Sequence, residues 1–134
     1  MSRLDLERAR FALEQINTVK EDEQHRENYL IELRDLPARL HTAGLGQTVA
    51  SLLASGEKNK ARLKIYGWLE EWLSRRPIHY PVNTQEGRHL IDCIVGSKLP
   101  DGVRTASYAA ASREARALAT WLKKFAEAFI PKKA

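Results

Sequence analysis

The most constraining feature of the sequence is a long apolar repeat near its C-terminal end, over residues 104–130. Apolar side chains recur there every three or four residues, at Tyr108, Ala111, Ala115, Leu118, Leu122, Phe125 and Phe129. This period places them on one face of an α-helix. Pro131 lacks the backbone N–H that another turn would use, so we expect the helix to end there.

Shorter repeats of the same period predict helices over residues 3–20, 26–44, 45–55, 57–76 and 83–95. Pro37 should kink the second of these or start a new turn, and we expect a boundary near Gly44, because glycine accepts the left-handed cap conformation. The segments 77–83 and 96–102 are expected to be connectors. No stretch shows the sustained alternation typical of a strand. The sequence therefore predicts an all-α protein, a single compact bundle of about six helices within one domain, 1–134.

Charge is distributed unevenly along the 134 residues, whose net charge is +5. Residues 1–36 hold six basic and nine acidic side chains, whereas the remainder holds sixteen basic and eight acidic ones. The basic region over residues 37–134 is suited to binding a polyanion, and the acidic region over residues 1–36 is suited to contact with a basic neighbour. A solvated surface of mixed charge explains both regions equally well. Charges interrupt every apolar segment, so no membrane span is expected. A single cysteine, Cys93, cannot form an internal disulfide, which fits a reducing cytoplasm.

The sequence lacks a cluster typical of catalysis or of metal binding. His89 and Cys93 share a helix face, but no second pair with zinc-site spacing accompanies them, so we expect no metal and place Cys93 in the core. The adjacent Glu70 and Glu71 point about 100° apart and are interpreted as a solvated face. The glycines at 44 and 46 follow a helix rather than a strand, so they are interpreted as a tight turn and not as a nucleotide-binding loop. No cofactor is expected.

Two groups of cations are candidates for nucleic-acid binding. The first lies on the last helix opposite its apolar stripe and comprises Arg113, Arg116, Lys123 and Lys124, which span about 16 Å, enough for two or three successive phosphates. The second lies at the start of the helix over 57–76 and comprises Lys58, Lys60, Arg62 and Lys64. The alternative for the first group is a solvated face with Glu127 as an intrahelical partner. Trp121 projects near the edge of the stripe and is a candidate contact with a partner subunit.

Three blocks of sequence, in this order, resemble the small subunit of Cmr-type (type III-B) CRISPR effector complexes. They are RARFALEQI at residues 8–16, then LP at 36–37 leading to GLGQT at 44–48, then Tyr108 with REA at 113–115 and WLKKFAEA at 121–128. The resemblance covers nearly the whole chain. Residues 77–83 and 110–112 are less typical of the family, so the resemblance says less about local contacts there.

The resemblance implies an all-helical, noncatalytic protein that packs in a few copies along a ribonucleoprotein filament and lines the channel for guide RNA and target RNA. The implied neighbours are the repeated backbone subunit, which cleaves RNA, the large polymerase-like subunit, and further copies of this chain. In such RNA-guided systems base pairing reads the sequence, so the protein need only hold phosphates. Lysine and arginine side chains without exposed aromatic residues among them fit that role.

The alternative from another class is a helical DNA-binding regulator. Residues 44–55 form the one segment that could act as a helix-turn-helix, and they offer Gln47, Thr48 and Ser51 to base edges but no arginine.

Overall fold

The all-α fold class is confirmed by the structure, a computed structural model that describes residues 1–75, 90–96 and 101–132. These residues form α1 (Arg3–Val19), α2 (Arg26–Ala54), the 3₁₀ turn η1 (Gly56–Lys58), α3 (Lys60–Arg75), α4 (Leu90–Gly96) and α5 (Asp101–Phe129), and they include no strand. Side-chain caps start two of the helices. Ser2 Oγ accepts the N–H of Asp5 at 3.0 Å before α1, and Asn59 Oδ1 accepts that of Arg62 at 3.1 Å before α3.

The described residues contain five α-helices where the sequence led us to expect about six. The difference arises because the helices expected over 26–44 and 45–55 follow each other directly and share the label α2, although the backbone between them is non-helical at Gly44. Of the helix expected over 83–95, the structure describes the part that forms α4, and residues 83–89 and the connector 77–83 lie outside the described residues. The last helix begins at Asp101, three residues before its expected start.

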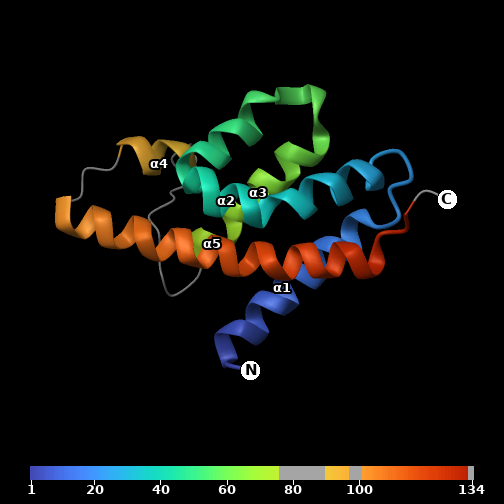
Figure 1. The fold of residues 1–134 in the computed structure, drawn as a ribbon, viewed down its shortest axis with the longest axis horizontal. Coiled ribbons are helices and arrows are strands. Elements are labelled where there is room, and N and C mark those ends of the chain that lie inside the picture. The colour runs from blue at the N-terminus through green and yellow to red at the C-terminus, as the bar shows by residue number, and fades with distance from the viewer. Residues whose placement is uncertain (76–89, 97–100, 133–134) are drawn as a thin grey trace.

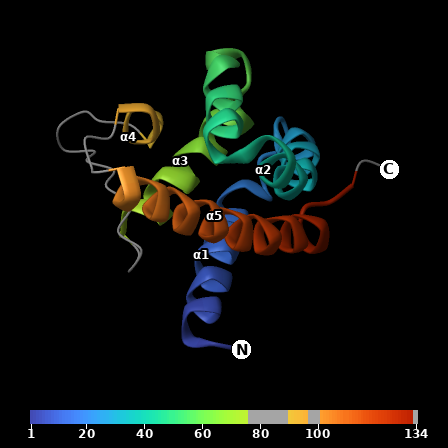
Figure 2. The same ribbon diagram turned by 60° about the vertical axis from the view of Figure 1, so that its left-hand side comes forward.

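α5 is the element around which the other helices are arranged. It packs along α2 on one side and is crossed by α1 on the other, while α3 packs on α2 (Figure 1, Figure 2). Alanines at several inward positions bring the neighbouring backbones close. The predicted stripe is confirmed at its fully buried members, Ala111, Ala115, Leu118 and Leu122.

The C-terminal end of that stripe differs from the prediction. Phe125 is only partly buried, and Phe129 is 48% exposed. The physical reason is the steep angle at which α1 crosses α5 (Figure 1), because a crossing helix covers only a limited length of its partner.

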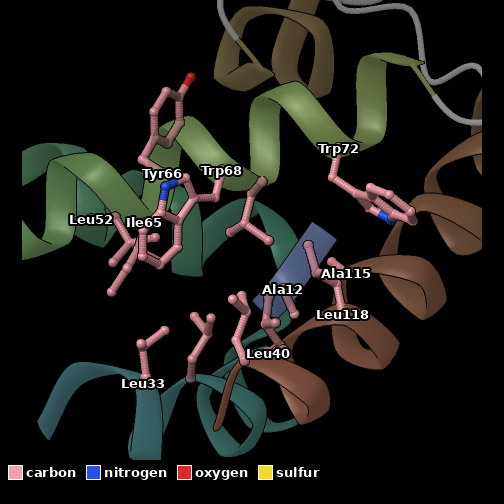
Figure 3. Close-up of a cluster of buried hydrophobic side chains, with 14 of the residues drawn as sticks. Ala12, Leu33, Leu40, Leu52, Ile65, Tyr66, Trp68, Trp72, Ala115 and Leu118 are labelled. Atoms are coloured by element: carbon pink, nitrogen blue, oxygen red, sulfur yellow. The ribbon is translucent and has the colours of Figure 1, made fainter. Parts of the chain in front are cut away.

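The hydrophobic core fills the space between α1, α2, α3 and α5 (Figure 3). Trp72 extends from α3 toward Ala115 and Leu118 of α5 (Figure 3), and its ring lies 5.0 Å from that of Phe11 of α1. Trp68, on the same helix, stacks on Tyr29 of α2 at 6.1 Å. Cys93 of α4 is buried as expected. The two tryptophans of α3 therefore connect it to the three other long helices.

A sharp change of direction divides α2 at Gly44, whose dihedral angles are φ 85° and ψ 167°. Nearly all residues with a side chain are excluded from this conformation. The break leaves backbone N–H groups without acceptors inside the helix. One of them, the N–H of Gly46, donates to the hydroxyl oxygen of Tyr108 on α5 at 2.9 Å. The expected boundary near Gly44 is thus confirmed as a kink, whereas Pro37 stays within helical backbone.

A buried carboxylate joins three helices. Glu114 of α5 is 3% exposed and accepts two hydrogen bonds from Arg8 of α1, from Nε at 2.6 Å and from Nη2 at 2.7 Å. It also accepts the indole N–H of Trp72 of α3 at 2.9 Å. The contact with Glu114 raises the pKa of Arg8, so the guanidinium keeps its charge. A buried carboxylate is tolerated only with such partners.

The same guanidinium extends this contact toward the start of α1. Arg8 Nη1 donates to Asp5 Oδ1 at 3.2 Å, and that oxygen also accepts the indole N–H of Trp121 at 2.9 Å. The Trp121 N–H first, and then Arg8, hold the pKa of Asp5 below its usual range. We call the five residues Asp5, Arg8, Trp72, Glu114 and Trp121 the Glu114 network.

We predict that Gly44→Ala lowers the free energy of unfolding by about 1–3 kcal/mol, because the backbone conformation at this position is strained for any side chain. An added Cβ would lie 3.7 Å from the Tyr108 hydroxyl, an ordinary contact, so the loss would come from the backbone. Gly67→Ala is the matched control, since Gly67 is exposed within α3 and should gain about 0.5–1 kcal/mol. Urea denaturation, monitored by circular dichroism, measures the free energy of unfolding of both variants. An equal change in this free energy for Gly44→Ala and Gly67→Ala would contradict the kink's dependence on glycine.

We predict that Glu114→Gln lowers the free energy of unfolding by about 3–5 kcal/mol, because the largely buried Arg8 charge loses its buried partner and keeps only the more exposed Asp5. Glu127→Gln is the control on the same helix. Its carboxylate is 42% exposed and lies 3.5 Å from Arg34, so its loss should amount to about 1 kcal/mol or less. Similar midpoints of thermal unfolding for the two variants would show that the buried charge does not hold the helices together.

Candidate nucleic-acid interface

The outward face of α5 carries the first predicted group of cations. The inward positions are filled by alanines and leucines, which leaves the opposite arc of the helix to solvent. Arg113 and Lys124 are exposed, and Arg116 and Lys123 are partly exposed. The exposed Thr120 lies between them. The structure therefore brings these four cations to one face, as their spacing predicted.

These cations lack a carboxylate partner among the described residues. Glu127 lies on the same face, and the sequence left open whether it compensates them. In the structure Glu127 Oε2 instead lies 3.5 Å from Arg34 Nε of α2. Lys124 Nζ lies 5.9 Å from the centre of the Trp121 ring, a cation–π contact that leaves its charge in place. The face thus keeps a positive charge that could hold an anion.

Contacts inside the chain engage two members of the second predicted group of cations. Arg62 lies against the buried Glu32 of α2, to which its Nε donates at 3.0 Å, and its Nη1 donates to Ser55 Oγ at 2.8 Å. Lys60 Nζ lies 3.8 Å from Asp22. Lys58 and Lys64 are exposed. Arg62 therefore fastens α3 to α2, and the free positive charge at the start of α3 is smaller than the sequence indicates.

Sequence reasoning missed two buried carboxylates, of which Glu32 accepts a hydrogen bond from Arg62 and Glu114 accepts two from Arg8. Glu32 and Glu114 were not singled out, because a charged residue in an amphipathic helix is normally assigned to the solvent side. A signal does exist in the spacing. Glu114 follows Ala111 by three residues and precedes Leu118 by four, so it lies within the apolar arc.

Trp121, the predicted contact with a partner subunit, already has partners inside the chain. Its N–H is accepted by Asp5, and its ring stacks on that of Phe125 at 5.4 Å. The side chain is partly buried. The part of the ring that remains exposed is what a neighbour could contact, and that contact stays a prediction.

The other polar groups have structural explanations. Glu70 Oε2 accepts the backbone N–H of Leu90 at 2.9 Å and so caps α4. His25 Nδ1 lies 3.0 Å from a carboxylate oxygen of Asp22 in the turn before α2. The described residues contain no group of three or more His, Cys, Asp or Glu that could hold a metal ion, and His89 lies outside them.

The DNA-binding alternative gains no support from the second half of α2. A DNA-binding helix here would need the polar side chains of Gln47, Thr48 and Ser51 on its surface. Gln47 and Ser51 are exposed, but Thr48 is 2% exposed and faces the core. In the described residues no helix combines the length and the apolarity needed to cross a bilayer.

Comparison with known proteins adds a family to this description. The model of the family described as CRISPR-associated protein (Cas_Cmr5) matches residues 4–129, from the first turn of α1 to the last residue of α5. No curated protein matches the chain significantly. The match includes all three blocks of sequence whose resemblance was noted above, and it covers far more than half of the chain. The chain therefore belongs to the Cas_Cmr5 family of CRISPR-associated proteins, the small subunits of type III-B Cmr effector complexes.

Proposed function

We propose that this chain is a noncatalytic subunit that lines the channel for guide RNA and target RNA and holds their phosphates with the outward cations of α5. The observation that carries the proposal is the engagement of Glu127 by Arg34, which leaves Arg113, Arg116, Lys123 and Lys124 uncompensated on one face. A subunit with this task needs no reading of bases, because pairing between guide and target supplies sequence specificity.

The physical basis of the proposal is the release of counterions. Each cation that meets a phosphate frees a condensed ion from the RNA, so affinity depends steeply on salt and little on sequence. The four side chains span about 16 Å along the helix, which matches two or three successive phosphates. The rigid packing of α5 on α1 and α2 would hold them at fixed spacing.

The proposal extends to the partners. The neighbours would be the repeated backbone subunit, the large polymerase-like subunit and further copies of this chain, in the cytoplasm and without a cofactor. The acidic region of residues 1–36 would meet a basic surface of one neighbour. Trp121 would contact a neighbouring subunit through the exposed part of its ring.

We predict that replacing the four cations by glutamine (Arg113→Gln, Arg116→Gln, Lys123→Gln and Lys124→Gln) weakens retention of target RNA by the reconstituted complex. Each lost phosphate contact should lower the slope of log affinity against log salt concentration by about 0.7–0.9, whatever the RNA sequence. Glutamine has nearly the same helix propensity, and the apolar face is untouched, so the fold should survive. Binding of labelled RNA over a salt series measures the slope.

The matched control replaces Lys58, Lys60 and Lys64 by glutamine and should leave the slope unchanged. Thermal unfolding of each isolated variant checks the fold. An unchanged slope in the α5 variant together with a reduced slope in the control would contradict the proposal and transfer the phosphate contacts to the start of α3.

A further inference from the structure

We propose that His41 of α2 binds the central phosphate of an RNA strand that lies on the cations of α5, and that its ring takes up a proton from solvent when the strand binds. The inference deepens the proposed function and rests on it, since the cations of α5 would hold the phosphates on either side. It adds a second helix to the candidate interface and makes RNA affinity depend on pH.

The position of His41 follows from the register of α2 against α5. The two helices pack along each other in antiparallel directions (Figure 1), and Arg34 Nε of α2 lies 3.5 Å from Glu127 Oε2 of α5. His41 follows Arg34 by two turns on the same side of α2, in helical backbone that precedes the kink at Gly44. Thr120 precedes Glu127 by two turns on α5. Since both steps advance about 10.5 Å in the same direction, His41 lies beside Thr120.

Thr120 lies in a gap between two pairs of cations. Arg113 and Arg116 precede it, Lys123 and Lys124 follow it, and the gap from Arg116 to Lys123 measures about 10.5 Å along the helix. The Thr120 hydroxyl donates to the carbonyl oxygen of Arg116 at 3.0 Å, so its proton is already in use. In the described part of α5, the outward side of this turn therefore has no side-chain donor left for a phosphate between the two pairs.

His41 supplies the donor that this turn lacks. Its side chain is exposed, and within the described part of the chain its ring takes part in no hydrogen bond or ion pair. A neutral imidazole offers a phosphate one N–H, whereas an imidazolium offers an N–H together with a full charge. Contact with a phosphate therefore favours the charged form of the ring.

The charges around His41 link the proton to the RNA. The charged groups of α5 nearest to it are Arg116 and Lys123, because Glu127 is engaged by Arg34. Without RNA a proton would be added to a positive surface, whereas the backbone of a bound strand brings negative charge to the same place. The proton and the strand therefore bind together.

The other elements packed on α2 present no free carboxylate to His41 among the described residues. On the side of α2 that faces α3, the buried Glu32 accepts hydrogen bonds from Arg39 and from Arg62. Asp35 lies 3.8 Å from the same Arg39. α4 contacts α2 beyond the kink, where Ile94 lies next to Gly46. An RNA phosphate is thus the anion that the surroundings of His41 leave room for.

The experiment measures binding of an oligouridine of about 20 nucleotides to the purified chain at about pH 8 and about pH 6. Neither uracil nor the phosphodiester titrates in this range. For the unchanged chain, affinity at about 0.1 M salt should rise about fivefold as the pH falls, and the slope of log affinity against log salt concentration should steepen by about 0.7, the effect of one phosphate contact on a single strand. His41→Gln should abolish both changes. His41→Lys carries its charge at both pH values and should bind at about pH 8 as tightly as at about pH 6.

His25→Gln is the matched control, because the His25 ring lies 3.0 Å from Asp22 in the turn before α2, about 24 Å along the helix from His41. It should keep the pH dependence of the unchanged chain. Calorimetry in buffers of different ionisation enthalpy counts the protons taken up on binding, and His41→Gln should take up fewer.

An equal pH dependence in the unchanged chain and His41→Gln would overturn the inference, as would weak binding of His41→Lys at about pH 8. Failure of the phosphate proposal has a different signature, an unchanged salt slope in the four-glutamine variant at both pH values. Circular dichroism of each variant verifies that the chain is folded.

Discussion

One buried carboxylate, that of Glu114, ties the rotation of α5 about its own axis to two neighbouring helices. Its hydrogen bonds to Arg8 of α1 and to Trp72 of α3 hold one side of α5 against these two helices. Turning the helix would take the carboxylate away from both donors and leave charges buried without partners. Since Arg113 precedes Glu114 by one residue, about 100° around the helix, the same contact also sets where the outward cations point.

The helices were predictable from sequence because their apolar period is regular, and the kink was predictable because only glycine tolerates the conformation at residue 44. Neither argument could predict that Glu32 and Glu114 are buried, or that Arg62 pairs with Glu32. Periodicity assigns charged residues to solvent, and the partners of these residues lie as far as 106 positions away in the chain. The exposure of Phe129 was missed for a related reason, since it depends on the angle at which α1 crosses α5.

The arrangement of ion pairs explains how a modest net charge yields a basic surface. The carboxylates of Glu32, Glu114 and Glu127 are each satisfied by an arginine of another segment. Glu32 and Glu114 are buried and the exposed Glu127 is held by Arg34, so none of these carboxylates compensates the cations of α5, which face solvent. The net charge of +5 therefore understates the positive charge offered on the face of α5.

The separation of 106 positions between Arg8 and Glu114 also shapes how the chain acquires its structure. During synthesis α1 leaves the ribosome long before α5 exists, so its buried side, including Phe11 and Ile16, waits in solvent for a partner. Closing so long a loop is slow in comparison with forming local helices. The core between α1 and α5 can therefore assemble only after translation has passed residue 114, and a transcript cut short within α5 would yield a chain with its earlier apolar faces left uncovered.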